Sequence, residues 1–97
     1  MLINSISDLR KAFRHGPYAW PGGYPCYLLL SDGEALSFKG AKANRRLLIE
    51  ALAEYQTNPH ERSGWRPIAL DVNWEESGLL CVHTGEAIES AYGEVTP

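Results

Sequence analysis

Positive charge is missing from the last third of this 97-residue chain, since no lysine or arginine follows Arg66. All nine lysines and arginines lie at or before that residue, although the whole chain has a formal net charge of −3. An uneven distribution of charge along a chain says more about its binding partners than about its fold. Here it predicts a negative surface that binds a basic partner. The fixed charges after Arg66 are Asp71, Glu75, Glu76, Glu86, Glu89 and Glu94.

Cysteine is scarce, and the two thiols of Cys26 and Cys81 are too few to form a disulfide framework. The longest apolar run, residues 26–30, is far shorter than a membrane span. The N-terminus also lacks the basic and apolar regions of a signal peptide. We therefore expect a protein of the host cell cytosol, cytoplasmic and without a membrane partner, whose cysteines are reduced and buried.

Enzyme motifs are absent as well. Gly22-Gly23 leads into Tyr-Pro rather than into a helix, no Gly-Lys-Ser/Thr follows, and no nucleophile elbow is present. The apolar and charged fractions, 44% and 22%, are ordinary for a folded globular protein. We expect a single domain over residues 1–97 that is not an enzyme and needs no cofactor.

Hydrophobic spacing predicts the α+β class, with an antiparallel sheet of four to five strands that carries its helices on one face. Ser7 is expected to cap the first helix, and Asp32-Gly33 between two β-prone runs indicates a hairpin. The predicted order is α-β-β-α-β-β-β. The elements are helix 8–15, strands 26–30 and 35–38, helix 40–56, and strands 67–75, 79–83 and 86–92.

Two of these elements carry predictions about which side chains face inward. Helix 40–56 is expected to bury an arc from Ala41 to Tyr55 that includes Asn44 and Leu47, with Ile49 outside it. Strand 67–75 alternates, which predicts one buried and one solvated face. The residues expected to face the core are Ile68, Leu70, Val72 and Trp74, and those expected to face solvent are Ala69, Asp71, Asn73 and Glu75.

Cys81 and His83 are candidates for a chemical site, because residues two apart on a strand share a face. A structural zinc ion needs four ligands, usually as two close pairs, and no second pair is present, so both are weak candidates. As a nucleophile, Cys81 would need an electropositive setting, whereas the acidic tail is expected to raise its pKa. A buried thiol beside a partly exposed histidine is the simpler interpretation.

Aromatic and basic residues allow other interpretations. The Pro- and Gly-rich loop 16–25 holds Tyr18, Trp20 and Tyr24, which either pack onto the body or form a contact surface. Binding a phosphate backbone needs a continuous positive surface, so direct nucleic-acid binding ranks below an acidic, protein-binding role. Solvated helix faces are the default interpretation of the basic clusters. These clusters are Arg10, Lys11, Arg14 and His15, and Lys39, Lys42, Arg45 and Arg46.

The C-terminal carboxylates converge if the last three predicted strands are neighbours. A clustered negative face speeds encounter with a basic partner and imitates the charge of a nucleic-acid backbone. Such residues also serve simply to keep a protein in solution. Paired carboxylates occur in glycosidases too, but a domain of this size has little room for a sugar cleft.

Five segments carry a family resemblance: Tyr18-Ala-Trp-Pro-Gly-Gly-Tyr-Pro25, Ser31-Asp-Gly-Glu-Ala-Leu-Ser-Phe38, Asp71-Val-Asn-Trp-Glu75, Cys81-Val-His-Thr-Gly-Glu86 and Ile88-Glu-Ser-Ala-Tyr92. They resemble a family of small proteins from phages, prophages and mobile elements of proteobacteria, over about residues 16–94. The resemblance implies a setting similar to that of anti-CRISPR proteins, which are small cytosolic inhibitors. Several of those bind the basic DNA-binding surface of a type I surveillance complex. It implies no catalytic residues.

The resulting hypothesis is a non-enzymatic, phage-encoded inhibitor that binds a type I CRISPR surveillance complex through an acidic surface and blocks target DNA binding. The alternative is a small zinc-binding or nucleic-acid-binding phage accessory protein, and both monomer and dimer remain open. Trp74 is expected to pack in the core. The predicted partner-binding residues are Asp71, Glu75, Glu76, Glu86 and Glu89 as charges, with Trp20 and Tyr24 as aromatic anchors.

Overall fold

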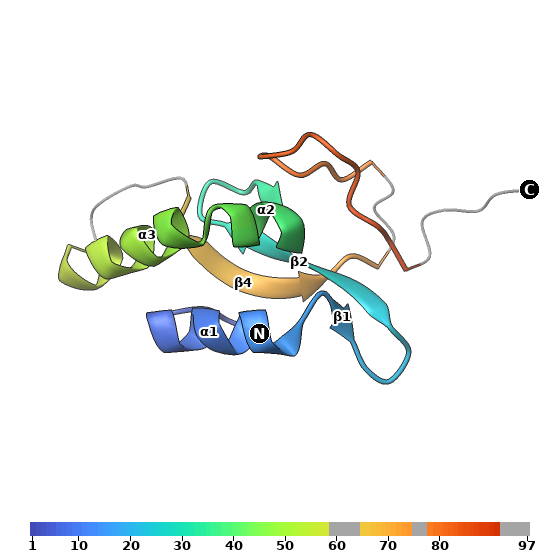
Figure 1. Ribbon diagram of the computed structural model, residues 1–97, viewed down its shortest axis with the longest axis horizontal. Helices are drawn as coiled ribbons and strands as arrows, with labels where there is room; N and C mark the ends of the chain where they lie inside the picture. Colours follow the sequence, from blue (N-terminus) through green and yellow to red (C-terminus); the bar gives the residue numbers. More distant parts are fainter. Residues whose placement is uncertain (59–64, 75–77, 92–97) are drawn as a thin grey trace, which may run out of the picture.

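The computed structural model describes residues 1–58, 65–74 and 78–91 of the chain. None of the helices in these ranges is both long and apolar enough to cross a lipid bilayer. The elements, shown in Figure 1, are α1 (Ile6–His15), β1 (Tyr18–Ala19), β2 (Tyr24–Leu30), β3 (Ala35–Leu36), α2 (Phe38–Ala43), α3 (Arg45–Thr57) and β4 (Pro67–Val72).

β2 is the central strand of a four-stranded antiparallel sheet. It pairs with β1 at its start, with β3 through Leu28 opposite Leu36, and with β4 through Leu28 opposite Leu70. The predicted α+β class with an antiparallel sheet is therefore confirmed. The apolar run of β2 suits this position, because none of its side chains is exposed on either face of the sheet.

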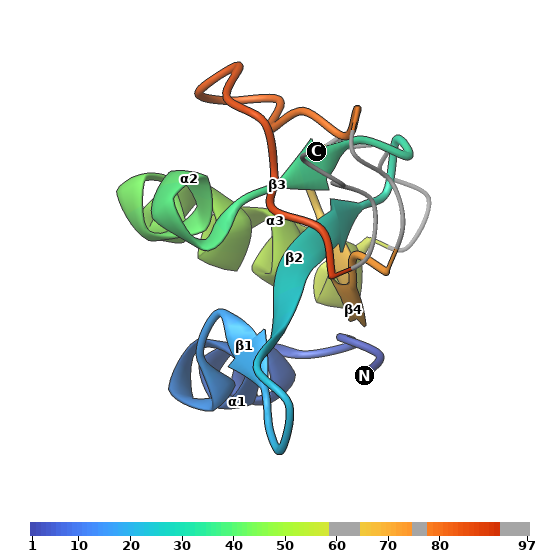
Figure 2. The same ribbon diagram turned by 90° about the vertical axis from the view of Figure 1, so that its right-hand side faces the viewer.

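Helices cover one face of the sheet. Along β2, Cys26, Leu28 and Leu30 are buried whereas Tyr27 and Leu29 are half-buried, because successive side chains point to opposite faces. Cys26, Leu28 and Leu30 belong to one cluster with side chains from all three helices, and Figure 2 shows α1 and α2 on the same side of β2. The helical members of this cluster are Leu9, Ala12, Phe38, Ala41, Leu48 and Leu52.

α1 begins earlier than predicted, because Ser5 caps it and Ser7 does not. The Ser5 hydroxyl accepts a hydrogen bond from the N–H of Asp8 at 3.1 Å, and the Asp8 carboxylate accepts one from the N–H of Asn4 at 3.0 Å. The first bond satisfies a donor that the first helical turn leaves unpaired, and the second ties the residue before the cap to the helix. The predicted stop at Gly16 is confirmed by its φ of 86°.

The prediction of one helix over residues 40–56 is wrong, because the helix is divided at Asn44 into α2 and α3. The side-chain Nδ2 of Asn44 donates to the carbonyl of Gly40 at 2.8 Å, and bonds of this kind compete with the regular helical pattern. We attribute the changed register of α3 to this break. Leu47, predicted to be buried, is 52% exposed, and Ile49, predicted to lie outside the buried arc, packs partly buried against the core.

Two hairpins lead into and out of β2. The predicted Asp32-Gly33 hairpin is confirmed: the Asp32 carboxylate accepts from the N–H of Glu34 at 2.9 Å, and Gly33 has a φ of 87°. The other hairpin was not predicted, because β1 falls in the loop rich in proline and glycine. Tyr18 of β1 pairs opposite Pro25 of β2, and the turn between them projects from the sheet (Figure 1).

The segment after residue 78 contains no regular strand within the described residues, so the two strands predicted there are wrong. Isolated bridges take their place, one of which joins Cys81 to Ala35 of β3. β4 pairs with β2 instead, and its outer edge is bridged by Leu2 opposite Ala69. The last three predicted strands therefore do not follow one another in the sheet, since the N-terminal residues occupy the place beside β4. Within the C-terminal segment, Leu80 and Ala87 are bridged to each other, and the N–H of Ala91 reaches the carbonyl of Asn73 just beyond β4.

Candidate partner-binding surface

The tip of the β1–β2 hairpin presents an exposed tryptophan. Trp20 is 76% exposed, and Gly22 and Gly23 follow it with φ values of 110° and 66°. A Cβ atom at Gly23 would lie 3.2 Å from the Trp20 ring, and one at Gly22 would lie 2.7 Å from the Tyr24 ring. The two glycines therefore let both rings lie directly against the backbone of the turn.

Trp74 adds a third aromatic side chain just beyond the end of β4. Its ring centroid lies 4.7 Å from that of Tyr24, and its side chain is 46% exposed. The prediction that Trp74 packs in the core is wrong, because β4 and its alternation end at Val72. We call Trp20, Tyr24 and Trp74 the aromatic surface.

Asn73, predicted to face solvent, is 3% exposed and joins three segments. Its N–H donates to the carbonyl of Pro25 at 2.9 Å, and its carbonyl accepts from the N–H of Ala91 at 2.8 Å. Its side-chain Nδ2 donates to the carbonyl of Glu89 at 3.0 Å. A buried amide needs partners of this kind, and here they hold the main chain of Glu89 beside the strand end that carries Trp74.

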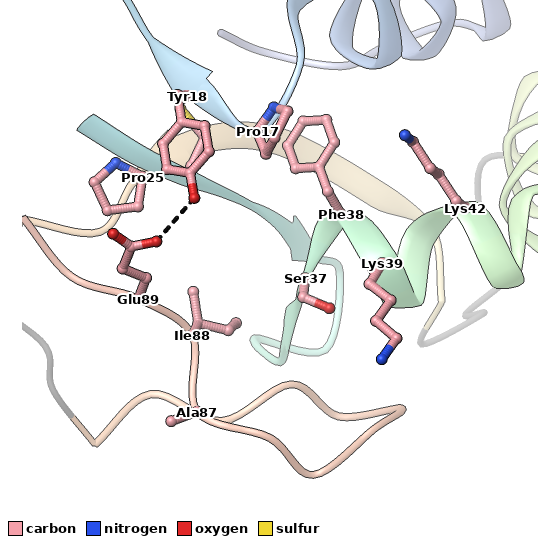
Figure 3. A pocket seen from close by; sticks show the side chains of 11 residues that line it. Pro17, Tyr18, Pro25, Ser37, Phe38, Lys39, Lys42, Ala87, Ile88 and Glu89 are labelled. Atoms are coloured by element: carbon pink, nitrogen blue, oxygen red, sulfur yellow. Dashed lines mark hydrogen bonds between the residues drawn. The ribbon is translucent and has the colours of Figure 1, made fainter. Parts of the chain in front are cut away.

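The side chain of Glu89 points back to the aromatic hairpin. Its Oε1 accepts a hydrogen bond from the Tyr18 hydroxyl at 2.9 Å (Figure 3). This hydrogen bond, the negative charge of Glu89 and slight burial raise the pKa of Tyr18 above its usual value. Of the predicted acidic residues, Glu89 is thus the one whose side chain contacts the β1–β2 hairpin that carries the predicted aromatic anchors, and it does so through Tyr18.

Asp71 and Glu86 do not converge, and the prediction that they do is wrong. Asp71 is exposed on β4 opposite Tyr27, on the face away from the helices, and after burial its charge is the second cause that raises the pKa of Tyr27. Glu86 lies 3.8 Å from the Nζ atom of Lys39 on α2, which packs on the other face. The predicted acids that lie outside the described residues are Glu75, Glu76 and Glu94.

A hollow of about 440 Å³ lies beside the Tyr18–Glu89 hydrogen bond. Figure 3 shows that Lys39 and Lys42 reach its rim from α2, while Glu89 stands at the opposite side. The walls between them include Phe38. Because both signs of charge stand at this rim, the hollow does not extend a negative surface.

Cys81 and His83 do not share a site. Cys81 is 1% exposed, and its sulfur accepts hydrogen bonds from the N–H and the hydroxyl of Ser37, both at 3.3 Å. The exposed His83 places its ring edge-on to Trp65, with centroids 6.3 Å apart. Over residues 1–58, 65–74 and 78–91, no group of three His, Cys, Asp or Glu residues is placed to hold a metal ion.

The prediction that acidic neighbours raise the pKa of Cys81 is also wrong. Burial does raise it, but hydrogen bonds from Ser37 and Thr84 outweigh burial and lower the pKa to about 7. Donors surround the sulfur where carboxylates were expected. The thiol therefore acts as an acceptor that fastens the C-terminal segment to the start of α2, and its burial leaves no room for a substrate.

Two contributors to this surface were missed in the sequence. For Tyr18, the sequence offers only its place in the aromatic loop 16–25, which does not indicate that its hydroxyl bonds to Glu89. Asn73 stood at a solvent-facing position of an alternating strand, a pattern that argues against burial. Its partners come from residues 88–91, which were assigned to a strand.

Comparison of the chain with protein-family models, with curated proteins and with solved structures finds no match. The resemblance to phage proteins stays a prediction.

Proposed function

We propose that this protein is a non-enzymatic inhibitor that binds the basic, nucleic-acid-binding surface of a type I CRISPR surveillance complex and blocks the binding of target DNA. The observation that carries the proposal is the aromatic surface, with Glu89 held beside it. Tryptophan and tyrosine contribute disproportionately to binding energy at protein interfaces. Rings already held against a turn lose little further freedom on binding.

The carboxylates supply charge complementarity in this proposal. Glu89 stands beside the aromatic hairpin, and Asp71 is exposed on the adjoining strand. Lysines and arginines that hold DNA phosphates would find partners in both, which favours fast encounter and correct orientation more than raw affinity. Glu86 has no part in it, because Lys39 lies beside its carboxylate.

The proposal can be tested with a purified type I surveillance complex and a labelled target duplex. We expect excess wild-type protein to reduce the fraction of duplex retained in a mobility-shift assay. The double variant Trp20→Ala/Trp74→Ala is expected to inhibit at least about thirtyfold more weakly, because interface tryptophans commonly contribute about 2 kcal/mol or more. Leu47→Ala is the matched control, since Leu47 is an exposed apolar side chain on α3, away from the hairpin.

Two outcomes would contradict the proposal at different levels. Undiminished retention of the duplex in the presence of excess wild-type protein would exclude the inhibition of target DNA binding. Inhibition that is equally strong for the wild-type protein and the double tryptophan variant would keep the inhibitor but remove the aromatic surface as its contact.

A further inference from the structure

A groove of about 390 Å³ lies between α1 and α3. Figure 1 shows these two helices in the half of the molecule away from the β1–β2 hairpin tip. Apolar side chains and guanidinium groups line it together, and we call it the arginine groove. Its lining residues are Leu9, Phe13 and Ile49, with Arg10, Arg14 and Arg45.

The three arginines are placed to act on one ligand. The Arg45 guanidinium lies over the Phe13 ring, with its Cζ atom 4.4 Å from the centroid. Arg10 and Arg14 lie one turn apart on α1, so they share a helix face. Stacking restricts the motion of the Arg45 guanidinium and leaves its in-plane N–H donors available.

These guanidinium groups have no carboxylate at ion-pair distance among the residues whose positions the structure describes. The ion pairs found there join Lys39 to Glu86 and Arg46 to Glu50. Three like charges around one groove repel one another, so an anionic ligand gains from all three.

We propose that the arginine groove binds an acidic peptide segment of a partner protein, with one large apolar side chain inserted between α1 and α3 and carboxylates on either side of it. Guanidinium forks match the geometry of carboxylates and bind them with two parallel hydrogen bonds. Phe13 and Ile49, which are partly buried, offer an apolar contact to the inserted side chain, whereas Leu9 is 1% exposed and belongs to the core. The groove involves none of the residues of the aromatic surface, so either site can exist without the other.

The observations favour a peptide over a nucleic acid. Nucleic-acid backbones bind along a continuous positive surface, whereas these charges surround one short groove in a chain with a net charge of −3. An apolar lining contributes little to phosphate binding, but it does stabilise an aliphatic or aromatic side chain that leaves water.

The test uses fluorescein-labelled peptides and fluorescence anisotropy. The probe is a ten-residue peptide with one central leucine flanked by glutamates. One matched peptide replaces the glutamates by glutamine, a second replaces the leucine by serine, and a single-stranded ten-nucleotide DNA carries the same label. We expect the probe to bind most tightly and its affinity to fall as salt is raised.

The groove is identified by a pair of charge-matched double variants. Arg14→Gln/Arg45→Gln is expected to weaken probe binding about tenfold or more, which corresponds to about 1.4 kcal/mol. Lys11→Gln/Arg46→Gln removes the same charge from the same two helices outside the groove, and it is expected to bind the probe nearly as the wild-type protein does. Far-ultraviolet circular dichroism checks that all variants keep their helices.

Four results would overturn this assignment. They are no measurable binding of the acidic probe, equal binding of the glutamine or the serine peptide, equal losses in the two double variants, and tighter binding of the single-stranded DNA than of the probe. The last result would assign the groove to a nucleic acid. Because the assay needs no surveillance complex, its outcome is independent of the proposed inhibition.

Discussion

The aromatic surface and the arginine groove are built in different ways. Residues far apart in the chain meet at the aromatic surface, where Asn73 holds Glu89 beside the end of β4. Two packed helices form the groove, and its arginines follow from helical spacing with one stacking contact on Phe13. The first region therefore depends on a few long-range hydrogen bonds, whereas the second depends on helix packing, so each can be perturbed without the other.

Asn73→Ala is expected to have the largest effect and to act on the aromatic surface alone. Removing the amide leaves the carbonyl of Glu89 without this donor, and a lost buried hydrogen bond costs about 1–3 kcal/mol in the free energy of unfolding. Denaturant unfolding measures this loss, and hydrogen exchange at the Ala91 amide reports release of the segment. Asp71→Ala, at an exposed position near the end of β4, is the control, and an equal loss there would contradict the role of Asn73.

Gly22→Ala should disturb the hairpin tip and leave the arginine groove intact. Its φ of 110° strains any other residue, and the new Cβ would lie 2.7 Å from the Tyr24 ring. We expect a loss of about 1–2 kcal/mol in the free energy of unfolding, together with weaker inhibition. Gly33→Ala isolates the backbone strain, since its φ is 87° and nothing lies within 4 Å of the added Cβ. Equal losses for both would show that the ring contact does not matter.

The thiol of Cys81 lies in neither the aromatic surface nor the arginine groove. Its pKa reports how the C-terminal segment is attached to the start of α2. Its pKa of about 7 lies below the ordinary 9.0, so this group stabilises the fold fully above about pH 9 and loses that contribution as the pH falls through about 7. Ser37→Ala removes one donor and should raise the pKa, whereas Ser37→Thr should restore it.

An ultraviolet titration of the thiolate in a Cys26→Ala background measures this shift, because burial raises the pKa of Cys26 and would otherwise add a second transition. An unchanged Cys81 titration in Ser37→Ala would mean that the hydroxyl is not the donor. Partner binding at either surface should be the same in both serine variants.

Glu89→Gln has the smallest expected effect on stability, since its bond to Tyr18 lies at the surface. Removing the negative charge should lower the pKa of Tyr18 toward its usual value. A tyrosinate absorbance titration detects the shift, with Glu86→Gln as a control that should leave Tyr18 unchanged. Inhibition of DNA binding should weaken in Glu89→Gln and not in Glu86→Gln.

The structural features that the sequence predicted correctly are those that depend on residues close together in the chain. The Asp32-Gly33 hairpin, the stop of α1 at Gly16 and the antiparallel α+β class all follow from short-range turn and periodicity rules. Trp20 and Tyr24 could be picked out for the same reason, because both belong to one loop, and their role as anchors stays a prediction.

Turn and periodicity rules do not predict which strands pair when they lie far apart in the chain. The position of β4 between β2 and the N-terminal residues separates Asp71 from Glu86, and nothing in strand 67–75 specifies which edge it pairs with. The break at Asn44 was also missed, because a periodicity argument treats asparagine by its angle on the helix and not by the bond its side chain makes.

The most direct test of two separate binding surfaces is to measure both activities on the same two variants. We predict that Trp20→Ala/Trp74→Ala loses inhibition of target DNA binding and retains the dissociation constant of wild-type protein for the acidic leucine peptide. Arg14→Gln/Arg45→Gln should lose the peptide and retain the inhibition. If either variant loses both activities to the same extent while its fold is intact, the account of two independent surfaces is contradicted.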